Sequence, residues 1–144
     1  MAETSAPTIQ VDIVSAEGQV FSGPAREVLA PASEGDVGIL PRHAPLLTLL
    51  KPGAVVVKTP EGEEHPVYVG GGVLEVQPQH VMVLADTAVR ARDIDEAAAL
   101  AAKQRAEETL RSKVNKIEQA EALAELARAV ALLKVVQRLR KVRG

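Results

Sequence analysis

The chain has 144 residues, 47% of them hydrophobic, so it is long enough for about one domain with a buried core. It has no cysteine and only 1% aromatic residues, which excludes disulfides and thiolate metal sites and argues against a surface that stacks nucleic-acid bases. The formal net charge of -2 combines an acidic segment through Arg92, with a net charge of -5, and a basic segment from Asp93 onward, with a net charge of +3.

The chain begins with MAETSAPT, which has no basic region followed by an apolar one, so we expect no secretory signal. No apolar run approaches the ~20 residues that a membrane span needs. Residues 8–14, TIQVDIV, alternate apolar Ile9, Val11 and Ile13 with polar residues. This period of two predicts a half-buried strand.

Further short, β-branched runs follow as far as Asp86. They are VVVKT at 55–59, PVYV at 66–69, VLEVQ at 73–77 and HVMVLAD at 80–86, separated by the turn sequences PEGEE, GGG and QPQH. Many short strands with no helical pattern between them disfavour a parallel βαβ architecture. We therefore expect an all-β sandwich of about ten short strands in residues 1–90.

The pattern changes at Asp93, where DIDEAAALAAKQRAEETLRSK is rich in residues that favour helices. Asp93 and Glu96, three residues apart, predict a capping box at the helix start. The segment SKVNK at 112–116 predicts a break, and a second helix is expected from about Glu118 to about Val142. The short break predicts an antiparallel helical hairpin in residues 91–144, which makes the chain α+β.

The first helix of this hairpin offers mostly alanine to a neighbour, and the second has two apolar stripes. A buried leucine contributes roughly 1.5–3 kcal/mol and an alanine much less, so we expect docking of the hairpin to be weak enough for a partner to reverse. The alternative is a permanently packed antiparallel pair. The alanines are Ala97, Ala98, Ala101 and Ala102; the stripes are Leu123, Leu126, Val130 and Leu133, and Leu132, Val136 and Leu139.

We find no motif of an enzyme or of a cofactor site. Gly70–Gly72 precede a strand pattern and not a helix, so they predict a turn or bulge between strands rather than a dinucleotide cradle. His43, His65 and His80 lie in separate segments without a second ligand at metal-binding spacing. No serine is framed by a nucleophile elbow. We therefore expect no catalytic residue, no bound cofactor and no metal.

Several segments together resemble the epsilon subunit of the F-type ATP synthase. They are VDIVSAEGQVFSG, SEGDVGILPRHAPLL, KPG, GGGVLEVQP, VLADTA and DIDEA, in the family's order and across essentially the whole chain. The resemblance implies a β-sandwich followed by a helical hairpin, and a non-catalytic subunit of the rotor. It implies that this subunit joins the gamma subunit to the c-ring and restrains ATP hydrolysis when its helices extend toward the alpha and beta subunits. It also implies a peripheral location on the cytoplasmic face of the bacterial inner membrane, held there through the complex.

The resemblance further assigns contact residues. Glu34, Gly35 and Asp36 would face the c-ring, whereas His43, Ala44 and Pro45 would lie near the ring and gamma contacts, with Ser15 on the gamma side. The residues of the arm that would meet an acidic segment of the beta subunit are Arg111, Lys113, Arg128, Lys134, Arg138 and Arg140. The alternative is that the glycines and prolines only shape the turn and that His43 makes an internal hydrogen bond.

Some members of this family bind ATP through a motif I/L-D-x-x-R-A at the start of the first helix. Here the segment reads Ile94-Asp95-Glu96-Ala97-Ala98-Ala99, so Ala98 replaces the arginine and we expect weak or absent nucleotide binding. Two other functions stay open: a free-standing binding adaptor of the same fold, and a small lyase or hydrolase using His43 and Asp36. The basic end of the second helix interleaves Lys and Arg with Leu and Val, which favours an acidic protein partner over nucleic acid.

Overall fold

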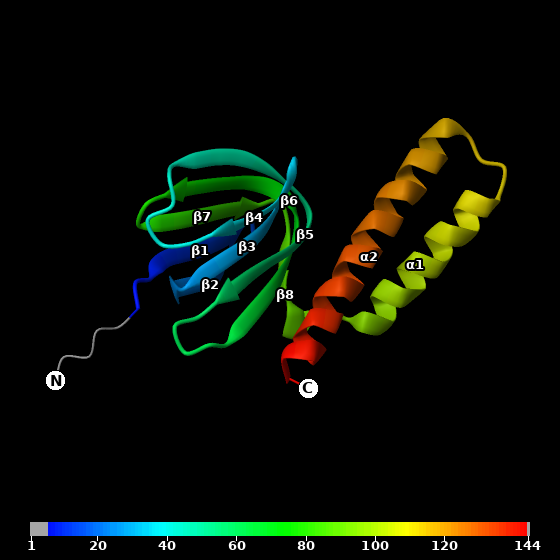
Figure 1. Ribbon diagram of the computed structural model, residues 1–144. Helices are drawn as coiled ribbons and strands as arrows, with labels where there is room; N and C mark the ends of the chain where they lie inside the picture. The colour runs from blue at the N-terminus through cyan, green and yellow to red at the C-terminus, as the bar shows by residue number, and fades with distance from the viewer. Residues whose placement is uncertain (1–5, 144) are drawn as a thin grey trace.

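Eight strands are followed by a short 3-10 turn and two helices in the computed structural model, which describes residues 6–143 (Figure 1). Residues 1–5, on which part of the secretory-signal expectation rests, and residue 144 lie outside the described part. The elements are β1 (Ile9–Ser15), β2 (Gly18–Ala25), β3 (Glu27–Ala32), β4 (Gly35–Ile39), β5 (Leu46–Lys58), β6 (Glu64–Gln77), β7 (His80–Ala85), β8 (Ala88–Arg90), η1 (Ala91–Asp93), α1 (Glu96–Arg111) and α2 (Lys116–Arg143).

The strands form one sheet that folds over on itself into two layers, which confirms the all-β sandwich. The first layer has the order β2-β1-β7-β6-β5, and the second contains β4, β3 and β5, with β6 and its neighbour β8 completing it. β5 and β6 belong to both layers, because they pair with each other over almost their full lengths of 13 and 14 residues. The structure has eight strands and not the ten expected, in part because the runs at 66–69 and 73–77 are two halves of β6.

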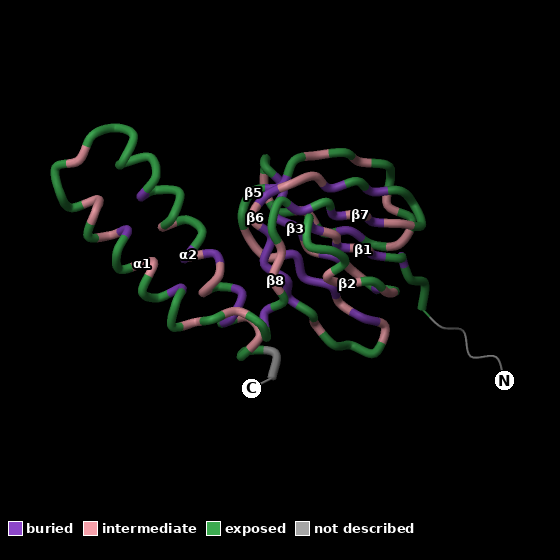
Figure 2. The backbone as a smooth tube through the Cα atoms, turned by 180° about the vertical axis from the view of Figure 1, so that it is seen from behind, coloured by how far each residue is buried: buried purple, intermediate pink, exposed green. Residues whose placement is uncertain are grey.

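The core lies between the two layers and consists of the inward-facing residues of each strand, drawn in purple in Figure 2. The alternation predicted for β1 is confirmed, because Ile9, Val11 and Ile13 are all buried there. Branched aliphatic side chains from β3, β5, β6 and β7 fill the rest of this space. A chain with almost no aromatic residues therefore builds its core from Val, Ile, Leu and Ala.

The three consecutive glycines lie inside β6 and let the strand pass from one layer to the other. Gly71 and Gly72 have φ values of +107° and +135°, which side chains rarely adopt. A Cβ atom added at Gly72 would collide with the Leu84 carbonyl oxygen of β7. The predicted turn or bulge between strands is therefore wrong, because the glycines lie within β6 and its pairing with β5 and β7 keeps one register through them; no helix follows them.

The N-cap of helix α1 lies two residues after the predicted one. Its N-cap is Asp95, whose side chain accepts a hydrogen bond from the Ala98 N–H at 3.0 Å. The capping box of Asp93 and Glu96 is wrong, because Asp93 lies in η1 and Ile94 after it is extended. Ile94 packs against the cluster between the hairpin and the sandwich, which holds this connection extended as far as Asp95.

The connection between the helices is short, which confirms the antiparallel hairpin. Asn115 and Glu118 cap α2 reciprocally: the Glu118 N–H donates to Asn115 Oδ1 at 2.8 Å, and Asn115 Nδ2 donates to Glu118 Oε1 at 2.7 Å. Over residues 6–143, neither helix combines the length and the apolar character that a membrane span requires.

The two helices meet through alanines, but not through the alanines that the sequence pattern suggested. Ala99 and Ala106 are buried on α1, and Ala122 and Ala129 are buried on α2, each pair one heptad apart. Antiparallel pairing about the connection places Ala106 opposite Ala122 and Ala99 opposite Ala129. The suggested Ala97, Ala98 and Ala101 are exposed and Ala102 is half-buried, while Leu123 of the first predicted stripe is also exposed.

A second, smaller cluster joins α2 to the outer face of the second layer. Ala131 and Val135 of α2 pack with Tyr68 of β6, and Leu132 and Leu139 contribute at its edge. This part of the second predicted stripe is confirmed. The contact involves few large side chains, so it binds the hairpin to the sandwich with a small apolar area.

Candidate functional site

The residues that the family resemblance assigned to docking lie at two separate places on the sandwich. Glu34 and Gly35 form the tip of the β3–β4 hairpin, which lies against β5 through a hydrogen bond from the Ser33 N–H to the Leu49 carbonyl at 2.9 Å. Gly35 has a φ of +135°, which explains a glycine at this turn. Ser15 ends β1 opposite Gly18 and is buried, with only 9% of its surface exposed.

His43, Ala44 and Pro45 lie in the loop between β4 and β5, at the other end of the first layer. The Arg42 N–H donates to the Pro78 carbonyl at 2.8 Å, which ties this loop to the β6–β7 turn. Pro45, just before β5, and Leu49, which accepts the hydrogen bond from Ser33, are four residues apart, which is about 13 Å along an extended strand. A His43 ring nitrogen lies 2.7 Å from the Ala44 carbonyl, so the internal hydrogen bond considered for this histidine is present.

An exposed apolar row crosses the outer face of the first layer between these two places. Leu49 of β5 pairs with Val73 of β6, Val73 pairs with Leu84 of β7, and Leu84 pairs with Val14 of β1. We call these four residues the apolar row. Leu49 is 62% exposed and Leu84 is 52% exposed, and Leu47, 71% exposed, lies beside the row on the same face. Contiguous exposed apolar side chains on a sheet mark an interaction surface.

Sequence reasoning missed this row. The segment LLTLL at 46–50 is apolar at four of five positions, and such a run is typical of a strand buried on both faces. Only the pairing of four strands reveals that alternate members of these runs come together on the solvent side.

A polar cluster borders the row on β1, β2 and β7. Asp12 lies 2.7 Å from His80, and Gln19 donates to Asp12 at 3.4 Å. Hydrogen bonds from Ser22 and His80 lower the pKa of Asp12 from its ordinary value. The Asp12 carboxylate therefore stays charged to a lower pH than an isolated aspartate and links the two neighbouring strands.

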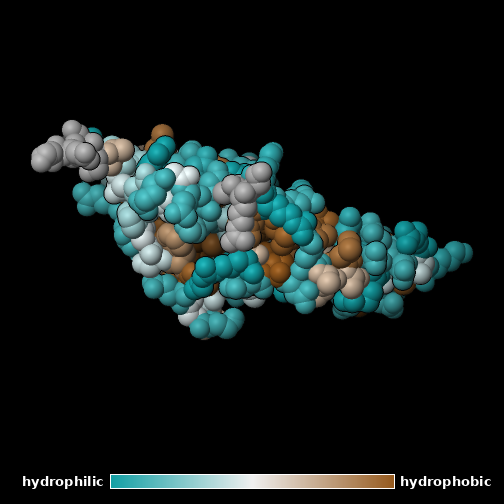
Figure 3. Space-filling model, turned by 90° about the horizontal axis from the view of Figure 1, so that it is seen from below, coloured by the Kyte–Doolittle hydropathy of each residue, from teal (hydrophilic) through white to brown (hydrophobic). Residues whose placement is uncertain are grey.

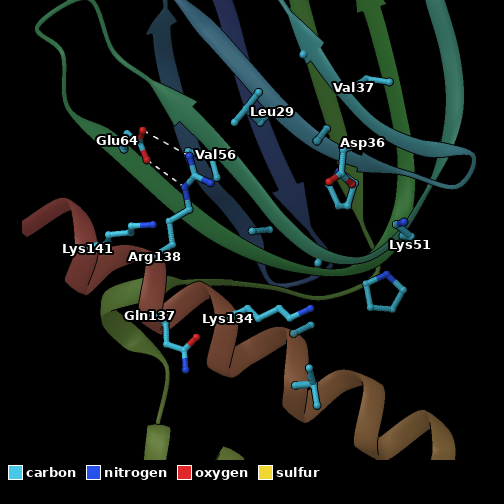
Figure 4. Close-up of a pocket in the computed structure, with 18 of the residues that line it drawn as sticks. Leu29, Asp36, Val37, Lys51, Val56, Glu64, Lys134, Gln137, Arg138 and Lys141 are labelled. Atoms are coloured by element: carbon cyan, nitrogen blue, oxygen red, sulfur yellow. Dashed lines mark hydrogen bonds and ion pairs between the residues drawn. The ribbon is translucent and has the colours of Figure 1, made fainter.

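An open groove of about 1320 Å³ runs between α2 and the second layer (Figure 4). Its apolar lining includes Leu29, Ala54 and Val130, and its charged lining comes from both walls. Asp36, assigned to docking by the resemblance, lines this groove from β4. The charged residues are Asp36, Lys51, Glu64, Lys134, Arg138 and Lys141.

The basic residues assigned to the arm occupy different surroundings. Arg138 forms an ion pair with Glu64 of the sandwich, and Arg140 with Glu96 of α1 at 2.6 Å. The Arg128 guanidinium lies beside the Tyr68 hydroxyl; burial raises the pKa of Tyr68 and the Arg128 charge opposes that rise. Lys134 is exposed at the groove, whereas Arg111 and Lys113 are exposed at the far connection between the helices.

A second, smaller hollow of about 740 Å³ lies where the end of α2 meets the sandwich. Phe21, Val67 and Leu139 are among its lining residues, and Phe21 and His65 contact each other with ring centroids 5.8 Å apart. Figure 3 shows that apolar surface gathers at this junction, whereas the far end of the hairpin is mostly hydrophilic.

The geometry offers no assembled catalytic site in the described residues. No group of three or more His, Asp or Glu side chains there could hold a metal ion. Asp36 lines the groove, while His43 bonds the carbonyl of Ala44 in the loop after β4, so the structure does not bring these two residues together as a lyase or hydrolase would require. At the start of α1, Ala98 is exposed and its N–H is already bonded to Asp95.

Comparison with known proteins gives matches over nearly the whole chain. Residues 8–91 match the family described as ATP synthase, Delta/Epsilon chain, beta-sandwich domain, and residues 92–137 match its long alpha-helix domain. The ATP synthase epsilon chain of Nitrosococcus oceani is 61% identical over 139 residues, covering 96% of this chain and 99% of the relative. That of Halorhodospira halophila is 61% identical over 136 residues, covering 93% and 96%.

Two solved structures share the fold. A chain in the cryo-EM structure of the Euglena gracilis mitochondrial ATP synthase, comprising OSCP, F1 and c-ring, superimposes with a TM-score of 0.82 at 18% identity, covering 93% of this chain and 84% of that one. A chain from the central stalk and c-ring of the Tetrahymena thermophila mitochondrial ATP synthase gives a TM-score of 0.60 at 12% identity, covering 92% and 99%.

Proposed function

Because the chain belongs to the ATP synthase delta/epsilon family, as an epsilon chain, we propose that it couples the gamma subunit to the c-ring and restrains ATP hydrolysis through its helical hairpin. In this role it carries no catalytic residue and acts only through its neighbours, the gamma subunit, the c-ring and the alpha and beta subunits. It is peripheral and reaches the cytoplasmic face of a bacterial inner membrane through the complex, as its bacterial relatives suggest.

The apolar row is the observation that supports docking of the sandwich. Leu49 and Leu84 are exposed on a rigid sheet, and burying two leucines against a partner contributes roughly 1.5–3 kcal/mol each. We assign the gamma subunit to this face, with Ser15 at its edge. Glu34 and Gly35 at the hairpin tip are assigned to the c-ring, and His43, Ala44 and Pro45 to the border between the two partners.

The packing of the hairpin supports its proposed regulatory role. The two buried residues of α1 are both alanines, and only a small apolar cluster joins α2 to the sandwich. A small apolar contact leaves the docked hairpin in the range of stability where a partner can shift the equilibrium. The released helices would then present their basic residues to an acidic segment of the beta subunit.

Neutralising Arg128, Lys134 and Arg138 together to glutamine tests this function. Exposed ion pairs contribute about 0.5 kcal/mol each, so removing three cations should weaken the inhibitory contact by about tenfold. We expect assembled enzyme with these changes to hydrolyse ATP several-fold faster than the wild type. The measurement is the steady-state rate of hydrolysis after reconstitution of the subunit into epsilon-depleted enzyme.

A triple change to glutamine at Lys103, Arg26 and Arg92 serves as a control, since it removes the same charge from residues outside the groove. The inhibitory role would be wrong if the first set left the rate unchanged, or if both sets raised it equally.

The isolated subunit should bind ATP weakly or not at all. Ala98 supplies no charge for a triphosphate, and losing a charge-assisted contact costs more than losing a neutral hydrogen bond. Calorimetric titration with ATP should give a dissociation constant well above the micromolar range. We expect Ala98→Arg to tighten binding, since this position is exposed at the start of α1. A micromolar constant for the wild type would contradict the prediction.

A free-standing adaptor of the same fold is the second candidate, because the apolar row could serve any partner. The two functions differ in what accompanies the chain: a rotor subunit purifies from native membranes with the other components of the rotary complex, whereas an adaptor does not. The basic end of α2 is assigned to an acidic protein surface, and no nucleic-acid partner is proposed.

A further inference from the structure

One pair of side chains ties the last turns of α2 to the sandwich. Arg138 Nε donates to Glu64 Oε1 at 3.1 Å, and Arg138 Nη2 donates to Glu64 Oε2 at 3.5 Å, so the guanidinium meets both carboxylate oxygens (Figure 4). The two side chains are only 39% and 22% exposed. A guanidinium and a carboxylate that face each other at two points form a stronger and more directional pair than a single exposed contact.

Arg138 has two lysines as neighbours on the same face of α2. Lys134 precedes it by four residues and Lys141 follows it by three, so the three side chains form a row, and all three line the groove. Within residues 6–143, neither lysine has a carboxylate within 4 Å, whereas Arg138 has Glu64. Of these three basic residues, Arg138 in the middle is therefore neutralised by Glu64, whereas the two lysines can still pair with a carboxylate.

We infer that Glu64 is an internal substitute for the carboxylates of an acidic partner segment, and that Lys134, Arg138 and Lys141 form the surface of α2 which that segment binds. This inference rests on the proposed function, in which the hairpin leaves the sandwich. Arg138 can meet the partner only after it gives up Glu64, because the same two-point geometry serves both carboxylates. Glu64 therefore opposes release of the hairpin, while Arg138 stabilises both the docked and the released state.

Two substitutions that break the same pair should then have different effects on the inhibition of ATP hydrolysis. Glu64→Gln leaves Arg138 in place and frees it, so release of the hairpin should increase about fivefold, which corresponds to about 1 kcal/mol. Arg138→Gln also frees the hairpin, but it removes the cation that the partner needs. Inhibition of ATP hydrolysis should therefore become stronger with Glu64→Gln, whereas with Arg138→Gln the gain in release is offset by the lost partner contact and inhibition should stay near the wild-type level.

Release of the hairpin is measured on the isolated full chain. The sequence has no cysteine, so Gln79→Cys in the sandwich and Ala124→Cys in α2, both at exposed positions, provide unique sites for a pair of spin labels. Distance distributions should show a larger released population for Glu64→Gln than for the wild type. Glu63→Gln is the matched control, because it removes the same charge one residue away and Glu63 makes no side-chain ion pair in the described structure. Equal populations for Glu64→Gln and Glu63→Gln would overturn the inference.

The rate of ATP hydrolysis is measured on epsilon-depleted enzyme reconstituted with the same variants. A rate lower than wild type for Glu64→Gln, together with a rate close to wild type for Arg138→Gln, supports the inference. Matching rates in the two variants, despite greater release, would overturn the role of Arg138 as a shared cation. A third outcome separates this inference from the proposed function. Every variant could release the hairpin as expected while even the triple change at Arg128, Lys134 and Arg138 leaves the rate of hydrolysis unaltered. The proposed inhibitory function would then be wrong, whereas the contact between Glu64 and Arg138 would keep its role in docking.

Discussion

Replacing Gly72 with alanine is expected to lower the free energy of unfolding by about 3 kcal/mol. Its φ of +135° costs a side chain roughly 1–3 kcal/mol, and the added Cβ would collide with the backbone of Leu84 and lie 2.9 Å from the Ala85 Cα. The neighbouring strand cannot yield cheaply, because β7 pairs with β1 on its other side. Denaturant unfolding of the isolated subunit measures the effect.

Gly23→Ala is the control for this prediction. Gly23 lies in β2, has no positive φ, and a Cβ added there would have the Phe21 ring as its nearest neighbour at 3.6 Å, an ordinary contact. We expect this change to alter stability by less than about 1 kcal/mol. Comparable losses at the two positions would show that the passage of β6 between layers does not depend on a glycine conformation.

Replacing Leu49 with glutamate is expected to weaken binding of the subunit to the gamma subunit by about 30-fold, or about 2 kcal/mol. Leu49 lies in the apolar row, so a partner that covers this face must desolvate the new carboxylate without a cation in the row to pair with it. The side chain is exposed in the free subunit, which should leave folding unaffected. Titration of epsilon-depleted enzyme with the purified variant measures the affinity.

Leu100→Glu provides the comparison, because Leu100 is 47% exposed on α1, outside the row. Its affinity for the depleted enzyme should equal that of the wild type. Unchanged binding with Leu49→Glu would remove the apolar row as the gamma-facing surface, and an equal loss with both variants would indicate a general effect of added charge.

The local periodicity of the sequence was enough to predict the layers and the helical hairpin. Ile9, Val11 and Ile13 recur every second residue because successive side chains of a strand point to opposite faces of the sheet, and only one face is buried. This alternation can be recognised in each strand by itself. The alanine-rich segment after Asp95 has no such alternation and can only pack as a helix. These features depend on neighbouring residues, which is why they can be predicted without the fold.

The remaining features depend on residues far apart in the chain. The apolar row needs the register of four strands, and the pair of Glu64 with Arg138 joins residues 74 positions apart. The N-cap of α1 is Asp95 and not the predicted Asp93, because Ile94 packs against the sandwich. This tertiary contact outweighs the local capping preference. The buried alanines were misassigned for a related reason, since the face of α1 that α2 covers is set by the connection at 112–115.

The two strands that run through both layers have a mechanical consequence. In most sandwiches, the sheets are held together by side-chain packing and by loops, so shear can make one sheet slide over the other. Here β5 and β6 are continuous across the fold, paired from Leu46 with Val76 to Lys58 with Glu64. Torque delivered to the first layer therefore reaches the second along covalent backbone and a shared hydrogen-bond ladder. A subunit that rotates with a central stalk benefits from such stiffness, because little of each rotational step is lost as twisting within the subunit.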